Sequence, residues 1–188
     1  AATLNPGSGC RPNGTGGGPS SRTAARKISS ALFSFEGAMA YWLMKSEPEE
    51  VSIDDLETRQ RVPWFGVRNY QARNFMRDAM RIGDLAFFYH SGCAEPGIAG
   101  ICEVCSPAHP DETQFDPASP YFDPKSLPEK PRWLCVDVKF VRKTQLLTLA
   151  EMRGFAALSQ MQILQRGNRL SITPVSPAEW DFLLERLK

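Results

Sequence analysis

The sequence LAFFYHSGCAEPGIAGICEVC, residues 85–105, contains two apolar runs that indicate the structural class of this protein. Residues 85–90 and 98–105 have the length and composition of buried strands, and turn-forming residues at 91–97 separate them. A third strand is predicted at 133–141, where apolar and polar residues alternate. The centre of the chain therefore predicts a sheet.

Short helices are predicted on either side of these strands. After a strand candidate at 41–45, Ser52 and the acids that follow it resemble a helix N-cap, which predicts a helix at 53–58. From Arg68 onward, apolar residues recur at helical spacing, which predicts an amphipathic helix ending near Gly83.

The last third of the chain adds a helix at 148–153, a strand at 169–173 and a final helix. That final helix begins with Ser176-Pro177-Ala178-Glu179, a capping box with proline at the first helical position. Because helices and strands are mixed without regular βαβ alternation, we expect an α+β fold whose strands curl into a small barrel.

Composition excludes several classes of protein. The chain has 188 residues, 42% hydrophobic and 23% charged, which suits one globular core and excludes fibrous proteins. No run approaches the roughly 18 apolar residues that a membrane span requires. The formal net charge of +1 argues against a histone-like nucleic-acid binder.

Residues 1–38 differ from the rest of the chain, since they are rich in Gly, Ser and Pro and contain no acid before Glu36. We expect them to be a disordered extension or tag-like tail, followed by a folded domain at 39–188. A transit peptide, which is rich in arginine and serine, and a functional arm are the alternatives.

Arginines gather between residues 59 and 81, where six of them accompany a single acid, Asp78. The first 40 residues hold four of the 22 basic and one of the 21 acidic residues, which leaves 18 basic and 20 acidic residues in the domain. On the predicted helix, Arg73, Arg77 and Arg81 are four residues apart and share one face. The planar guanidinium group of arginine can donate two hydrogen bonds to one phosphate group, so these arginines are predicted to contact phosphates. The alternative is that they only form a solvated face of the helix.

Aromatic residues cluster beside this basic segment. The loop PWFGVRNY, residues 63–70, would stack a flat ring on an aromatic side chain and read its edge with Asn69. In the strand FFYHS at 87–91, alternation sends Tyr89 and Ser91 to one face and His90 to the other. One face is expected to pack in the core and the other to line a cavity, although aromatics are as often core residues alone.

The five cysteines indicate free, mostly buried thiols in a reducing compartment. His90 and Cys93 followed by Cys102 and Cys105 resemble zinc-ligand spacing. However, residues three apart on a strand point to opposite faces, so packing thiols are favoured over a metal site. No metal or cofactor is expected.

No catalytic motif is present, since the chain lacks G-x-S-x-G, H-E-x-x-H and a P-loop. His90 and Ser91 are adjacent and would point to opposite faces of a strand, which disfavours a Ser-His couple. His90 as a general base remains the alternative to a pocket or core histidine.

Several motifs in register resemble the EVE domain family, from about Met39 to the C-terminus. They are YWLMKSEP at 41–48, WFGVRNYQARNF at 64–75, FYHS at 88–91, EPGIAG at 95–100 and RLS at 169–171. The resemblance implies a PUA-like pseudo-barrel of about five to six strands flanked by short helices. It also implies binding of modified nucleobases in DNA or RNA without catalysis, because related YTH domains hold a methylated base in an aromatic pocket.

By this resemblance, the pocket is expected at residues of three motifs: Lys45, Ser46, Trp64, Asn69, Tyr89, His90 and Ser91. Trp64 would stack on the base, and the phosphates would meet Arg68, Arg73 and Arg77. The expected partner is modified DNA or RNA, with no membrane, for a monomer in the bacterial cytoplasm or in a eukaryotic nucleus or organelle. An enzyme acting on a nucleobase or nucleotide through His90 and a small-molecule or protein-interaction module are the alternatives.

Overall fold

The structure is a computed structural model that describes residues 39–188, so the predicted extension at 1–38 lies outside the described residues. Within residues 39–188, every helix is too short or too polar to traverse a bilayer. The elements are, in chain order, β1 (Tyr41–Ser46), α1 (Ile53–Arg59), β2 (Arg61–Pro63), α2 (Tyr70–Asn74), the π-helix η1 (Phe75–Ala79), β3 (Leu85–His90), β4 (Gly97–Val104), β5 (His109–Pro110), the 3-10 helix η2 (Glu112–Gln114), β6 (Leu134–Cys135), β7 (Asp137–Thr148), α3 (Leu149–Arg153), the 3-10 helices η3 (Ala156–Leu158) and η4 (Gln162–Leu164), β8 (Ile172–Val175) and α4 (Pro177–Leu184).

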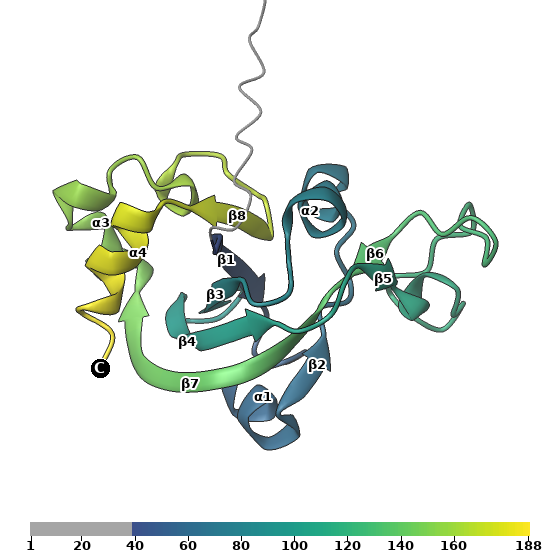
Figure 1. Ribbon diagram of the computed structural model, residues 1–188, viewed down its shortest axis with the longest axis horizontal. Coiled ribbons are helices and arrows are strands. Elements are labelled where there is room, and N and C mark those ends of the chain that lie inside the picture. Colours follow the sequence, from purple (N-terminus) through teal and green to yellow (C-terminus); the bar gives the residue numbers. More distant parts are fainter. Residues whose placement is uncertain (1–38) are drawn as a thin grey trace, which may run out of the picture. The chain divides into compact units, whose positions relative to one another are not determined.

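Six strands form one mixed sheet in the order β2-β7-β4-β3-β1-β8. β1 and β3 are parallel, and the other neighbours in this sheet are antiparallel. The long strand β7 bends strongly and carries the sheet around the core (Figure 1). The sheet and its short helices confirm the predicted α+β class with five to six strands.

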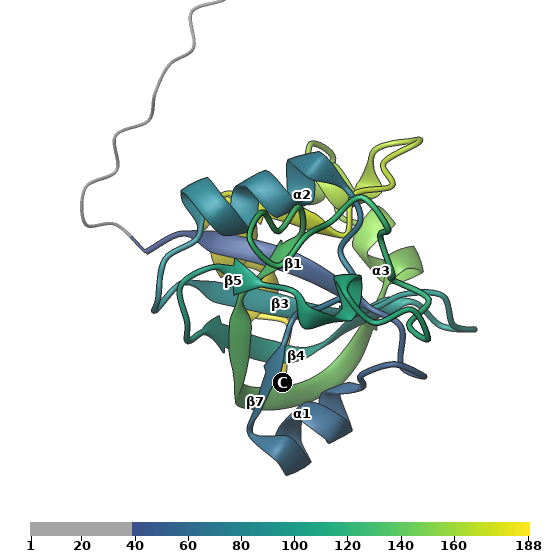
Figure 2. The ribbon, with the colours of Figure 1, turned by 90° about the vertical axis from the view of Figure 1, so that its right-hand side faces the viewer.

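Two hydrophobic clusters cover the two faces of the sheet. Trp42 and Phe88 belong to the cluster that α1 and α2 cover, whereas Leu43, Phe87 and Tyr89 belong to the cluster that α3 and α4 cover. Figure 2, turned by 90°, shows α1 and α2 at opposite ends of the sheet. Phe87 and Phe88 point to opposite faces of β3 and are both buried in the core, because a central strand is covered on both faces.

The predicted helix at 68–83 divides into two parts. Asn69 is the N-cap, so the helix begins at Tyr70. At its other end the N–H of Met80 donates to the carbonyl of Phe75 at 2.8 Å, five residues back, which is a π-turn. The wider turn interrupts the 3.6-residue period, and Arg81 lies beyond the end of η1.

Two predicted strands have different bounds because pairing partners, rather than local sequence, define them. β7 continues to Thr148, well beyond the predicted end at 141, since Thr148 pairs with Gly97 of β4. β8 begins at Ile172 instead of 169, where its pairing with Met44 of β1 starts. Residues 142–148 of β7 do not alternate between apolar and polar residues, so the pattern gave no signal for this part of the strand.

The β4–β7 pair contains one very close backbone contact, at Gly97. A Cβ atom on Gly97 would lie 2.3 Å from the carbonyl oxygen of Leu147, and a backbone atom in a sheet cannot move aside easily. Gly97 is therefore required for the two strands to pair at this edge.

We predict that Gly97→Ala lowers the free energy of unfolding by about 1 to 3 kcal/mol or more, as overpacking does. Gly154→Ala is the control, because its Cβ would lie 3.2 Å from the nearest atom and the φ angle of Gly154 is −73°. Urea unfolding measures both variants, and equal stabilities would contradict the close contact.

His90, the last residue of β3, caps the first turn of α1. Its Nε2 atom accepts a hydrogen bond from the N–H of Ile53 at 3.1 Å, and its ring packs edge-on against Phe88. Only a neutral imidazole can accept this bond. Burial is the main cause that lowers the pKa of His90 below its ordinary value.

This contact predicts a pH-dependent stability. Below about pH 6.5, His90 is protonated in the unfolded chain but stays neutral in the folded protein, because folding lowers its pKa. The free energy of unfolding of the wild type therefore falls as the pH falls. His90→Phe lacks the titrating group, and the gap in unfolding free energy between the two proteins should narrow from about pH 7.5 to 5.5. A gap that stays constant across this range would contradict the role of His90 as a neutral acceptor.

Candidate functional site

A cavity of about 340 Å³ opens where the ends of β1 and β3 meet three loops. Its size falls within the range of roughly 300 to 1,000 Å³ that small-molecule sites occupy. The loops are those before α1, before α2 and before β8, and the long proline-rich loop at 106–131 adds one further residue. Six predicted residues line it: Lys45, Ser46, Trp64, Arg68, Asn69 and Ser91. We call it the main cavity.

Trp64 forms an aromatic part of the wall. It is only 6% exposed and packs edge-on against Phe88, with ring centroids 5.3 Å apart. Within residues 39–188, its indole N–H donates no hydrogen bond, unlike the indoles of Trp42 and Trp133, which donate to aspartates. Trp64 therefore offers a ligand both apolar surface and a spare donor.

Asn69 has a fixed orientation at the edge of the cavity. Its side-chain oxygen accepts hydrogen bonds from the N–H groups of Gln71 at 2.8 Å and Ala72 at 3.1 Å, as an N-cap does. Because the oxygen faces the helix, the amide NH₂ group is left as a donor for a ligand.

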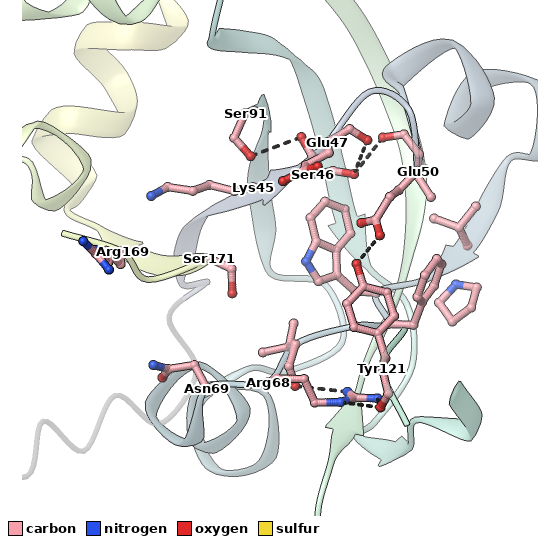
Figure 3. Close-up of a pocket in the computed structure, with 17 residues that line it drawn as sticks. Lys45, Ser46, Glu47, Glu50, Arg68, Asn69, Ser91, Tyr121, Arg169 and Ser171 are labelled. Atoms are coloured by element: carbon pink, nitrogen blue, oxygen red, sulfur yellow. Dashed lines mark hydrogen bonds between the residues drawn. The ribbon is translucent and has the colours of Figure 1, made fainter. Parts of the chain in front are cut away.

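The strand ends provide the opposite wall. The N–H of Ser91 donates to the carbonyl of Ser46 at 2.9 Å, and the Ser46 hydroxyl donates to the carbonyl of Val51 at 2.7 Å. Lys45 is half-buried beside them, and this burial lowers the pKa of its ammonium group. Lys45 makes no ion pair with an acid of residues 39–188. Figure 3 shows Lys45, Ser46 and Ser91 facing Asn69 and Arg68 across the cavity.

Tyr121 enters the main cavity from the long loop and closes one side. Its hydroxyl donates to a carboxylate oxygen of Glu50. Burial, followed by this hydrogen bond, raises the pKa of Tyr121 to about 12, so the phenol stays protonated at neutral pH. The ring lies so close to Gly66 that a Cβ there would be 2.8 Å from its Cζ atom, and the φ angle of Gly66 is +79°, which also favours glycine.

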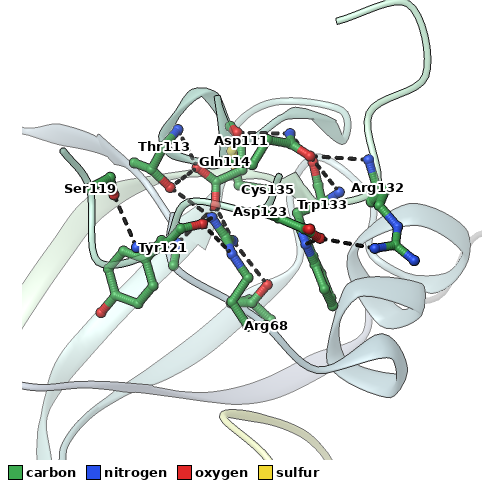
Figure 4. Close-up of polar contacts among 12 residues, drawn as sticks. Arg68, Asp111, Thr113, Gln114, Ser119, Tyr121, Asp123, Arg132, Trp133 and Cys135 are labelled. Carbon is green, nitrogen blue, oxygen red and sulfur yellow. Dashed lines mark hydrogen bonds and ion pairs between the residues drawn. The ribbon is translucent and has the colours of Figure 1, made fainter. Parts of the chain in front are cut away.

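Arg68 holds this loop in place. Its Nε atom donates to the carbonyl of Tyr121 at 2.8 Å, and its Nη1 atom pairs with Asp111 at 2.8 Å (Figure 4). Asp111 also accepts from the N–H of Gly66 at 2.9 Å and from Thr113. Burial would raise the pKa of Asp111, but the hydrogen bonds from Arg68, Thr113 and Gly66 together hold it below the ordinary value. The contacts of Arg68 are thus structural.

The other two predicted phosphate ligands lie outside the cavity lining. Arg73 donates to the carbonyl of Arg132 at 2.9 Å and lies over the ring of Tyr70. Arg77 is exposed and pairs with Asp78 at 2.7 Å. Their contact with phosphate stays a prediction, and in this structure both guanidinium groups already have partners.

Tyr89 and His90 are likewise absent from the main cavity. Tyr89 is 2% exposed in the core beside α4 and reaches a neighbouring hollow instead. His90 bonds to α1, as described above. The contact of these two residues with a base stays a prediction.

Several lining residues of the main cavity were not among the predicted site residues, and four of them are polar or aromatic residues from other parts of the chain: Glu50, Tyr121, Arg169 and Ser171. Tyr121 belongs to the loop at 106–131, whose many prolines indicate a functional segment but no particular residue. Arg169 and Ser171 lie in the RLS motif, which was a usable signal.

Arg68 is expected to determine the position of the Tyr121 loop. Lysine keeps the positive charge but cannot bond Asp111 and the Tyr121 carbonyl together, so Arg68→Lys should lower the free energy of unfolding by about 1 to 3 kcal/mol. The loop at 106–131 should also become more sensitive to protease. Arg77→Lys, at an exposed ion pair, should cost less than about 1 kcal/mol. Equal proteolysis of both variants would contradict this role.

Comparison with known proteins adds independent information. A sequence model of the EVE domain matches residues 40–186. Human thymocyte nuclear protein 1 is 42% identical over 179 residues, which are 85% of this chain and 79% of that protein.

Solved structures agree with this likeness. A crystal structure of a Pseudomonas syringae protein has a TM-score of 0.76 and 48% identity, covering 78% of this chain and 99% of that chain. The human THYN1 protein in complex with 5-methylcytosine containing DNA has a TM-score of 0.72 and 43% identity, covering 78% and 96%. The predicted PUA-like fold is confirmed. This chain belongs to the EVE domain family.

Proposed function

We propose that this protein binds modified nucleobases in DNA, and that the main cavity holds the base. The observation that carries the proposal is the combination in one cavity of an aromatic wall, fixed donors and carboxylates. Such a combination suits a planar heterocycle whose edge carries both acceptors and donors.

The donors and acceptors fit a pyrimidine edge. Asn69 and Trp64 offer N–H donors to the ring acceptors, and Lys45 adds a partly desolvated cation. Glu47 and Glu50 line the same cavity, and carboxylates accept well from the exocyclic amine of cytosine. A methyl group on the base would gain from contact with the apolar wall.

The relative with a solved complex supports 5-methylcytosine as the first base to test, since that human protein was crystallised with DNA containing it. The base modification, the preference for DNA over RNA and the monomeric state belong to the proposal. We also propose that the family domain begins at residue 39. A DNA partner implies the nucleus in a eukaryote and the cytoplasm in a bacterium.

Two groups that resemble catalytic machinery favour binding over turnover. His90 uses Nε2 to accept from a backbone N–H, which occupies the atom that a general base would need. Cys135, His109 and Asp137 are neighbours, but the thiol is 1% exposed and lies 3.6 and 3.7 Å from the two ring nitrogens. Burial raises the pKa of Cys135 to about 12, the opposite of an activated nucleophile.

Asn69→Asp tests the cavity without removing the helix cap. Aspartate caps as well as asparagine, but it replaces the NH₂ donor with a carboxylate. We expect the affinity for an oligonucleotide containing 5-methylcytosine to fall about 5- to 150-fold, as the loss of about 1 to 3 kcal/mol implies. Fluorescence anisotropy at fixed salt measures the affinity, and mass spectrometry should recover the oligonucleotide unchanged.

Asn74→Asp is the matched control, because it adds the same charge on the same helix outside the cavity lining, where Asn74 bonds Arg73. It should leave the affinity unchanged within about 3-fold, which corresponds to about 0.6 kcal/mol. If the wild-type protein binds modified and unmodified oligonucleotides of DNA and RNA equally well, the proposed selectivity is wrong. If the two variants bind alike, the cavity assignment is wrong.

A further inference from the structure

A second hollow of about 380 Å³ lies next to the main cavity, and the two share Lys45 and Ser91. Its other walls come from α3, η4 and the loop at 165–168. Arg153 of α3 and Arg166 of that loop both line it. We call this space, lined by Lys45, Arg153 and Arg166, the cationic hollow.

The cationic hollow differs from the main cavity in charge. No Asp or Glu is among the residues that line it, whereas Glu47 and Glu50 line the main cavity. Within residues 39–188, neither Arg153 nor Arg166 forms an ion pair or donates a side-chain hydrogen bond. Unpaired positive charge with no acid nearby attracts an anion.

Backbone groups of the same loop add to this. Gly167 has a φ angle of +80°, and within the described residues the N–H groups of Arg166 and Gly167 have no acceptor. Successive N–H groups in such a turn commonly face an anion. On the adjoining side of the main cavity, Figure 3 shows Arg169 and Lys45 at the same edge.

In contrast to Arg153 and Arg166, the arginines of α2 and of the residues beside it already have partners within the protein. Arg68, Arg73 and Arg77 each have an acceptor or acid partner within the protein, so contact with phosphate would exchange one partner for another. Arg153 and Arg166 have no such partner to lose. These two unpaired arginines therefore lie on the α3 side of the main cavity.

We propose that the cationic hollow binds the phosphodiester groups of the strand that flank the base in the main cavity. This rests on the proposed function and deepens it, because it places the path of the nucleic-acid backbone over α3 and the loop at 165–168. Arg153 and Arg166 contact phosphate, and Lys45 lies at the boundary between base and backbone.

The salt dependence of binding tests this path. Each lost phosphate contact reduces the slope of log K against log salt by about 0.7 to 0.9. The double variant Arg153→Gln, Arg166→Gln should therefore lower the slope by about 1.4 to 1.8. Oligonucleotides with and without 5-methylcytosine should weaken by the same factor, so that the ratio of their affinities is unchanged.

The matched control removes two positive charges elsewhere. Arg59 and Lys139 line neither hollow and pair with Asp55 and Glu103. The double variant Arg59→Gln, Lys139→Gln should leave the slope as in the wild type. A third variant, Arg77→Gln, tests the helix that the sequence favours. The proposal is overturned if Arg77→Gln reduces the slope while the Arg153 and Arg166 variant does not.

Titration with inorganic pyrophosphate separates this proposal from the base-binding function. Arginine side-chain NMR signals of Arg153 and Arg166 should shift, and those of Arg77 should not. If no oligonucleotide binds the wild-type protein, the proposed function fails and these shifts alone decide whether the hollow binds phosphate. Absence of shifts overturns the proposal. Shifts with pyrophosphate, combined with an unchanged oligonucleotide salt slope, also overturn it, because the hollow would then bind a free phosphate compound instead.

Discussion

The parallel pairing of β1 with β3 is the constraint on which the rest of the structure depends. The two strands run in the same direction and are in register from Tyr41 with Leu85 to Ser46 with His90. Because parallel strands end at the same edge of a sheet, Ser46 and Ser91 meet there although 45 residues separate them. Both strands are buried, so their ends are held firmly. The main cavity and the cationic hollow both open at this edge, and each includes Lys45.

The partly buried ion pair of Arg68 and Asp111 provides the second wall. A buried pair contributes little net stability, because desolvation offsets the attraction, but it specifies one arrangement of its surroundings. Here it fixes the loop that carries Tyr121 against Gly66, where no side chain would fit. Arg68, which the sequence predicts as a phosphate ligand, therefore holds the loop in place.

The positive charge that a ligand experiences in this protein depends on which cations already have a partner, and not only on how many cations a segment contains. The arginine-rich segment at 59–81 is the most basic part of the sequence, yet its side chains mostly bond to nearby acids and carbonyls. Arg153 and Arg166 stand alone in the sequence and have no such partners within the described residues. Fixed partners reduce the field that a ligand experiences, whereas unpaired cations retain it.

The sequence by itself determined the α+β class, most element positions, the helix caps at Ser52 and Ser176, and six residues of the main cavity. The class, the element positions and the caps follow from local pattern, since caps and apolar periodicity depend on neighbours in the chain, whereas the cavity residues follow from the motifs that resemble the EVE domain family. Only the tertiary structure decided that Arg68 bonds a loop more than 40 residues away, that His90 faces α1, and that Tyr121 completes the cavity. Such contacts depend on strand pairing and on long-range hydrogen bonds, which leave no periodic trace in the sequence.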